Sequence, residues 1–305
     1  MQQTTQAIVE TIRVIFEPRY AAQQAQVAGQ SRAVWRMFAG LALVLFISYL
    51  GSGLVYGLAR RFGADPATLQ LGTTPIAMLI LLFSFVFASI GVVLAMPLLQ
   101  RRPVAELFGP VPLFFRQFRN TVAALILLWG VVTVLPPYDL GAPLTANLTL
   151  GAWLRWLPLA VLAVLVQVEA EELLFRGYLQ QALAARFRSG WIWMGAPSVI
   201  FALGHYLPAE AGENAIWVAL WAGLFAVLMA DLTARAGSLG PAVAVHFVNN
   251  AVALLIVGAP EGLNGLALFL SPYTLSDTAE IRPWLWVDFA MMLVSWLAAR
   301  LAIRA

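Results

Sequence analysis

The chain has 305 residues, of which 61% are hydrophobic and only 11% are charged. Soluble domains carry roughly a quarter charged residues, so this composition indicates a membrane protein. The net charge is +3, every basic residue is arginine and no cysteine is present, which excludes disulfides, thiolate metal sites and a cysteine nucleophile. No basic run interleaves with aromatic residues, so we expect no nucleic-acid partner.

Apolar windows follow one another along the chain, each close to the roughly 20 residues that a bilayer-spanning helix needs. The eight windows cover residues 37–59, 76–99, 121–138, 156–175, 191–207, 215–232, 239–259 and 284–303. They predict an all-α, polytopic membrane protein with about eight transmembrane helices. Residues 1–34 are predicted to be a cytoplasmic leader without the features of a cleaved signal peptide, and residues 35–305 to form a single transmembrane domain.

Arginines recur in alternate connections between the predicted spans. The segments that carry them hold Arg13, Arg19, Arg32, Arg36, Arg101, Arg102, Arg116, Arg119, Arg186, Arg188, Arg235, Arg300 and Arg304. The positive-inside rule then places both termini in the cytoplasm, with Arg60 and Arg61 as an exception in the first loop. We therefore expect an integral, multi-pass protein of a bacterial cytoplasmic (inner) membrane.

The fourth span ends in EAEELLFRG, which places three carboxylates and an arginine after a long apolar run. The pattern predicts one helix from Trp153 to about Phe187. On this helix Glu171 and Glu172 point about 100° apart, whereas Glu172 and Arg176 share a face. Ionised groups near the bilayer centre cost roughly 3 kcal/mol or more, so these should face a wet, protein-lined interior. We expect the arginine to hold one carboxylate and leave the other for a ligand, a water molecule or a metal.

The chain has only two histidines, and both lie in predicted spans. The turn between the fourth and fifth spans centres near Ser189, at almost equal distances along the chain from Glu172 and His205. These two residues should therefore come level in an antiparallel helical hairpin. His246 and Asn250 are four residues apart and share one face of the seventh span. We expect three helices to converge on one polar intramembrane cavity.

Structural explanations compete with a functional one. A membrane histidine or a glutamate–arginine pair, taken alone, serves equally well as an interhelical hydrogen bond or a structural ion pair. Asn249 fits such a bonding role or a lipid-facing edge, and Asp231 with Arg235 fits an ion pair at a helix end. Glu169 has no assigned role, and Asp288 is an isolated acid in the last span. The convergence of both histidines on the densest acidic cluster favours a functional site.

These groups are sufficient for amide hydrolysis. A carboxylate beside an imidazole can take a proton from water, and a second imidazole with a carboxamide can donate hydrogen bonds to a developing oxyanion. The chain has no H-E-x-x-H motif. Ser198, seven residues before His205, is a weak candidate for a serine nucleophile.

Three motifs on successive spans resemble those of the CAAX prenyl protease and bacteriocin-processing (CPBP, or Abi) family of intramembrane endopeptidases. They are Glu171-Glu172-x-x-x-Arg176, Phe201-x-x-x-His205 and His246-x-x-x-Asn250. The resemblance covers a core at about residues 150–260. It implies a helical membrane protein whose polar cavity opens towards the cytoplasm and in which a peptide bond is cleaved.

The resemblance also implies residue roles. Glu171 would be the general base that activates water, assisted by His205, while His246 and Asn250 would stabilise the oxyanion. The remaining first-motif residues, which would orient the site and balance its charge, are Glu172 and Arg176. The family's naming favours a metalloprotease, and the candidate ligands of a divalent metal such as zinc are Glu171, His205 and His246. The spacing is not a standard zinc pattern, however, and the same groups can activate water without metal.

The implied substrate is a membrane-associated or lipidated peptide or protein, with the lipid bilayer as the other partner. Two other function classes stay open. A noncatalytic scaffold or bacteriocin self-immunity protein would keep the fold without turnover. A proton-coupled transporter would also use intramembrane acids and histidines, although the chain shows no inverted repeat.

Overall fold

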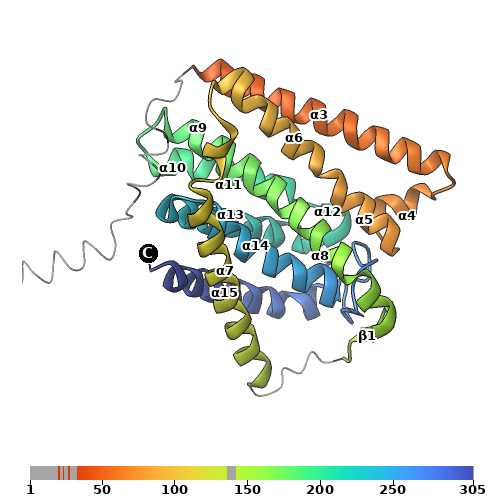
Figure 1. The fold of residues 1–305 in the computed structure, drawn as a ribbon. Coiled ribbons are helices and arrows are strands. Elements are labelled where there is room, and N and C mark those ends of the chain that lie inside the picture. Colours follow the sequence, from red (N-terminus) through yellow and green to blue (C-terminus); the bar gives the residue numbers. More distant parts are fainter. Residues whose placement is uncertain (1–19, 21–22, 24–26, 28–32, 136–141, 305) are drawn as a thin grey trace, which may run out of the picture.

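The computed structural model describes residues 20, 23, 27, 33–135 and 142–304. Over these residues the chain is mostly helical, which confirms the predicted fold class (Figure 1). The predicted leader, residues 1–34, lies largely outside the described residues.

Six helical stretches are long and apolar enough to cross a membrane. They are α3 (Val34–Arg61); α5 (Pro75–Ser84), α6 (Val86–Ala95) and η1 (Met96–Gln100); η2 (Val104–Leu107) and α7 (Val111–Val134); α8 (Leu150–Glu172), η3 (Leu173–Gln180) and α9 (Gln181–Ala184); α12 (Pro208–Ala211), η4 (Gly212–Asn214) and α13 (Ala215–Ala236); and α15 (Thr278–Ile303). Each corresponds to one predicted window.

The predicted count of eight spans is not confirmed, because the fifth and seventh windows form shorter helices. These are the stretch Gly190–Gly204, made of α10 (Gly190–Trp193) and α11 (Gly195–Gly204), and the stretch Gly240–Ile256, made of α14 (Gly240–Ala251) and η5 (Val252–Ile256). Every residue of α14 from Gly240 to His246 is buried. The first half of α14 is therefore apolar because the protein interior surrounds it, whereas the stretch Gly190–Gly204 keeps large apolar side chains such as Trp191, Val199 and Leu203 exposed.

Glycines allow the helices to pack closely at several positions, and at Gly91 and Gly240 the close contact is with backbone atoms of the neighbouring helix. A Cβ atom at Gly91 of α6 would lie 2.7 Å from the Cα of Val44 in α3, and these helices run side by side in Figure 1. A Cβ at Gly240 would lie 2.4 Å from the backbone oxygen of Phe114 in α7. Residues without a side chain therefore let α3 meet α6 and α14 meet α7 at backbone contact distance.

A small sheet joins the loops at one end of the bundle. Strand β3 (Phe269–Leu270) pairs antiparallel with β1 (Thr145–Ala146) and parallel with β2 (Val257–Gly258). The Asn147 side chain donates hydrogen bonds to the carbonyls of Asn264 and Ala267, both at 2.8 Å. This sheet, which the sequence analysis did not predict, ties the segment before α8 to the segment before α15. Helix α4 (Pro66–Leu71) lies in the connection between α3 and α5.

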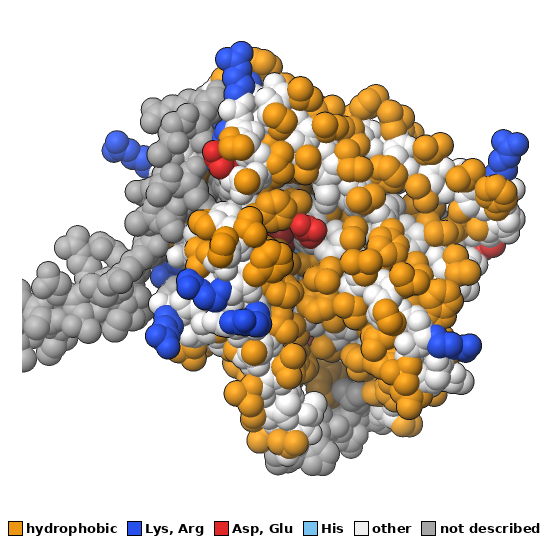
Figure 2. Space-filling model, viewed as in Figure 1, with side chains coloured by type: hydrophobic (Ala, Val, Ile, Leu, Met, Phe, Trp, Pro, Cys, Tyr) orange, Lys and Arg blue, Asp and Glu red, His pale blue; other side chains and the backbone are white. Residues whose placement is uncertain are grey.

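The outer surface is largely hydrophobic. Figure 2 shows apolar side chains over much of the face between the two ends of the molecule, with several arginines grouped near one end. Large exposed apolar residues lie on α3, α7, α8 and α15. Contiguous apolar surface of this extent is typical of helices that face lipid.

Candidate active site

A buried ion pair forms the centre of the site. The Nη1 of Arg176 donates to Oε1 of Glu172 at 2.9 Å, and the side chains are 2% and 0% exposed. The Nη2 of Arg176 donates to the backbone oxygen of Ala226 in α13 at 3.2 Å. The guanidinium also lies over the Phe201 ring, 5.2 Å from its centre. The contact predicted from the i, i+4 spacing is therefore present, and α13 and α11 hold its arginine in place.

His246 joins the two acidic side chains. Its Nδ1 lies 2.8 Å from Oε1 of Glu172, and its Nε2 lies 3.7 Å from Oε2 of Glu171. An ionised carboxylate can only accept a hydrogen bond, so Nδ1 carries the proton in this contact. The neutral ring then presents the lone pair of Nε2 towards Glu171. Glu172 thus orients the ring of His246.

Glu171 belongs to a second hydrogen-bonded chain. The amide of Gln167, one turn earlier on α8, donates to Oε1 of Glu171 at 2.6 Å. The amide of Asn250 on α14 donates in turn to Oε1 of Gln167 at 2.8 Å. Sequence reasoning missed Gln167. The available signal was its position four residues before Glu171, as a polar residue inside an apolar run.

Both glutamates keep one unpaired oxygen. Oε2 of Glu171 and Oε2 of Glu172 are buried without a hydrogen-bond partner among the described residues. Buried carboxylate oxygens are normally paired, so unpaired ones mark positions where a water molecule or substrate group would fit. The Glu171 side chain is 17% exposed, whereas that of Glu172 is fully buried. Glu171 is therefore the more accessible of the two.

His205 lies beside this cluster across an aromatic ring. Its ring stacks on the ring of Phe201, with the ring centres 4.4 Å apart. The Phe201 ring also meets the ring of His246 edge-on, with the centres 6.3 Å apart. The Nδ1 of His205 lies 2.8 Å from the backbone oxygen of Phe201, so Nδ1 carries the proton and Nε2 is unprotonated in the neutral ring. Within the described part of the chain, no hydrogen bond or ion pair connects His205 to either glutamate.

The described residues do not form a metal-binding site. No group of three or more histidine, cysteine, aspartate or glutamate side chains there is arranged to hold a metal ion. Glu171 and His246 adjoin each other, but Nδ1 of His246 is occupied by Glu172 and His205 stands apart. The candidate ligand set of Glu171, His205 and His246 is thus not brought together, and the chemistry below uses only the chain's own groups.

The other polar candidates lie elsewhere. Asp231 and Arg235 form an ion pair at 2.7 Å near the end of α13. The hydroxyl of Ser198 donates to the backbone oxygen of Met194. Asn249 donates to the side chain of Asn250 at 3.2 Å. Only Asn249 therefore connects directly to the hydrogen-bonded chain of the site.

The family comparison covers this part of the chain. Residues 150–252 match the model of a family described as type II CAAX prenyl endopeptidase Rce1-like. This segment is similar to the CAAX endopeptidase family. It begins at α8 and ends at the start of η5, so it contains all six candidate site residues. No curated protein and no solved structure matches the chain.

The CAAX endopeptidase segment and the apolar helices together define the class of protein. The chain is an integral, multi-pass membrane protein, and its residues 150–252 are similar to a family of peptidases. The resemblance inferred from the three motifs is confirmed.

Proposed function

We propose that the protein is an intramembrane endopeptidase that hydrolyses a peptide bond in a membrane-associated or lipidated peptide. The observation that supports this most directly is the buried Oε2 of Glu171, which has no hydrogen-bond partner among the described residues and lies beside Nε2 of His246, inside the segment that matches the CAAX endopeptidase family. The two atoms are 3.7 Å apart, so one water molecule can contact both.

Glu171 is the general base in this mechanism. Its Oε1 is fixed by Gln167, which leaves Oε2 to accept a proton from the water molecule. The water oxygen forms a bond to the carbonyl carbon of the substrate, and the carbonyl oxygen becomes the oxyanion. When the tetrahedral intermediate collapses, the carbon–nitrogen bond breaks and the proton passes to the leaving nitrogen. The products are a carboxylic acid and an amine.

The remaining motif residues stabilise charge. His246 contacts both acids and can hold a proton at Nε2, from which it would donate to the oxyanion. Asn250 has two amide N–H groups, of which one donates to Gln167 and the other is left for the oxyanion. Arg176 offsets the charge of Glu172. His205 would assist with its unprotonated Nε2 from across the Phe201 ring.

The membrane placement belongs to the same proposal. The distribution of arginines supports cytoplasmic termini and a bacterial inner-membrane location. Prenylated proteins are one class of lipidated substrate within the family description, and a membrane-anchored peptide is the broader class that we propose.

The test is cleavage of a library of membrane-anchored reporter peptides by the purified full chain in lipid bilayers. We expect Glu171→Gln to abolish cleavage while its thermal unfolding stays close to that of wild type, because glutamine keeps the acceptor for Gln167 but cannot take a proton. Glu210→Gln, at an exposed acid outside the cluster, is the matched control and should cleave normally. Equal cleavage by Glu171→Gln and wild type would contradict the mechanism. Folded wild type that cleaves no peptide would favour the noncatalytic scaffold.

A further inference from the structure

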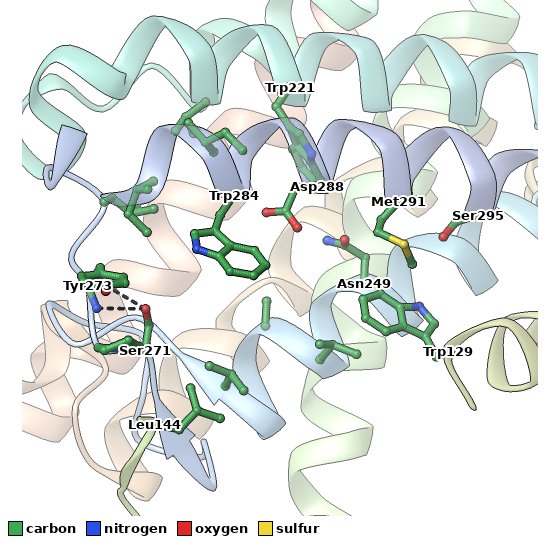
Figure 3. A pocket seen from close by; sticks show the side chains of 18 residues that line it. Trp129, Leu144, Trp221, Asn249, Ser271, Tyr273, Trp284, Asp288, Met291 and Ser295 are labelled. Carbon is green, nitrogen blue, oxygen red and sulfur yellow. Dashed lines mark hydrogen bonds between the residues drawn. The ribbon is translucent and has the colours of Figure 1, made fainter. Parts of the chain in front are cut away.

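A separate cavity opens beside the hydrogen-bonded cluster. It has a volume of about 480 Å³ and lies between α7, α13, α14, η5, α15 and the loop that contains Ser271 and Tyr273 (Figure 3). Its walls are mostly apolar. It lies outside the polar cluster, and none of the six candidate catalytic residues lines it.

Asp288 is the one charged side chain among the residues that line this cavity. Figure 3 shows its carboxylate pointing into the space between Trp284 and Asn249. No residue within four positions on either side of it in α15 is charged. The described residues supply it with neither an ion-pair partner nor a hydrogen bond. Since an ionised group inside a membrane protein normally has a partner, this carboxylate lacks one that an occupant of the cavity could provide.

Aromatic rings line the same cavity as the acid. Trp129, Trp221, Tyr273 and Trp284 all line the cavity, and the indole nitrogen of Trp221 is buried with no hydrogen-bond partner in the described part of the chain. Aromatic faces attract cations, and tryptophan does so most strongly. A carboxylate inside such a set of rings, with apolar walls, fits a positively charged group carried on a flexible apolar stem. Lysine and arginine side chains have this construction.

Two short routes connect the cavity to the proposed catalytic groups. On the polar route, Asn249 lines the cavity and donates to Asn250, which donates through Gln167 to Glu171. On the aromatic route, Trp221 stacks on Phe225 at 5.4 Å. Phe225 in turn meets the ring of His246 edge-on at 5.1 Å. A peptide whose scissile bond lies at Glu171 therefore has this cavity within a few side chains of its neighbouring residues.

We propose that the cavity is the subsite for a lysine or arginine side chain of the peptide substrate, with Asp288 as its counter-charge. The proposal rests on the peptidase function proposed above. It predicts a preference for a cation at one fixed position near the cleaved bond, which the catalytic groups alone do not require.

The test uses reporter peptides in which a single lysine is moved through the positions on each side of the cleaved bond. Each is matched by a peptide with norleucine, which has a similar stem without the charge. At one position we expect wild type to cleave the lysine peptide with a kcat/KM roughly tenfold above that of the norleucine peptide. Asp288→Asn should remove this difference and leave cleavage of the norleucine peptide unchanged. Glu280→Gln, an exposed acid in the first turn of α15 that does not line the cavity, should keep it.

Two results would overturn the proposal. Wild type that cleaves lysine and norleucine peptides equally at every position has no cation subsite. An Asp288→Asn protein that loses activity on both peptides to the same extent would assign the acid a structural role.

A binding measurement separates this proposal from the peptidase function. Fluorescence anisotropy of a labelled lysine peptide, with its cleavable amide replaced by a reduced bond, reports occupancy without turnover. Binding that depends on the lysine and on Asp288, in a protein that cleaves nothing, would support the cavity and refute the peptidase. Cleavage without any charge-dependent binding would support the peptidase and refute the subsite.

Discussion

Replacing Arg176 with methionine removes the one arginine that, among the described residues, contacts the fully buried carboxylate of Glu172. The methionine side chain fills part of the same space but cannot donate the 2.9 Å hydrogen bond to Glu172 or the 3.2 Å bond to the oxygen of Ala226. Glu172 keeps the hydrogen bond from His246, and its Oε2 has no other partner among the described residues. Removing one partner of a buried ion pair costs roughly 3–5 kcal/mol, because the other charge stays buried. We expect Arg176→Met to lose free energy of unfolding in this range.

Arg235→Met is the matched control. Arg235 also pairs with an acid four residues earlier, at 2.7 Å, but each side chain of that pair is 11% exposed. Asp231 also accepts hydrogen bonds from Tyr20 and Trp296. The acid therefore remains satisfied when Arg235 is removed, and the expected loss is about 1 kcal/mol.

The assay is reversible unfolding in mixed micelles by titration with a denaturing detergent, followed by circular dichroism. The double variant Arg176→Met with Glu172→Gln should be more stable than Arg176→Met alone, because it leaves no unpaired charge in the interior. A loss below about 1 kcal/mol for Arg176→Met would contradict the role of the buried pair. A double variant whose loss equals the sum of the single losses would also refute the argument, since it would show no coupling between the two side chains.

Three further predictions concern other parts of the molecule. Gln167→Leu should lower kcat by roughly 10²-fold without changing the helical content, because the general base loses its orientation; unchanged cleavage would exclude a positioning role. Gly240→Ala should lower the free energy of unfolding by about 1–3 kcal/mol through a clash with backbone atoms. Gly130→Ala, which has open space around it, should leave the free energy of unfolding unchanged. Burial and the carboxylate of Asp231 raise the pKa of Tyr20 above its usual 10.0. Its contribution to stability is therefore complete below that pH and decreases as the pH rises above it, and Tyr20→Phe should show a smaller decrease in the alkaline range.

The long apolar helices were predictable because their length and hydropathy are enough to identify them in the sequence. The windows placed α3 and the stretch from α5 to η1 within a few residues of their ends, and the last window matched the end of α15 but not its start. The third window began at residue 121, ten residues after the start of α7 at Val111. Arg116 and Arg119 lower the hydropathy of this first part, although arginine stems extend along a helix and keep their charges at its edge. The fifth and seventh windows were counted as spans because hydropathy does not distinguish a short apolar helix from one that crosses the bilayer; the first half of α14, for example, is buried in protein.

Contacts within one helix were more predictable than contacts between helices. The spacing of Glu172 and Arg176 is enough to predict their pairing, because a helix brings residues four apart together. Which acid meets Nδ1 of His246 depends on how far α14 is rotated about its axis against α8. That rotation follows from side-chain packing, including the approach of Gly240 to α7, and no periodicity in the sequence encodes it. The same reason explains why the link from Gln167 to Asn250 was missed.

The position of the π-helical segment η3 explains how the continuous helix α8–η3 contacts both α14 and α13. Segment η3 begins directly after Glu172, and η5 begins two residues after Asn250. A π-helical turn changes the direction in which the following side chains point, and such turns occur often at functional sites. Before η3, the side chain of Glu171 faces α14 through His246.

Within η3, side chains contact α13 instead. Arg176 donates to the oxygen of Ala226 and Gln180 to the oxygen of Ala230, so donors four residues apart meet acceptors four residues apart. Alanines expose these carbonyls because they add little bulk to the α13 surface, and small residues at this spacing let membrane helices approach closely. The arginine that neutralises Glu172 is thereby anchored to a helix that carries none of the six candidate catalytic residues. A shift of α13 would therefore move the countercharge of Glu172 and, through Glu172, the ring of His246.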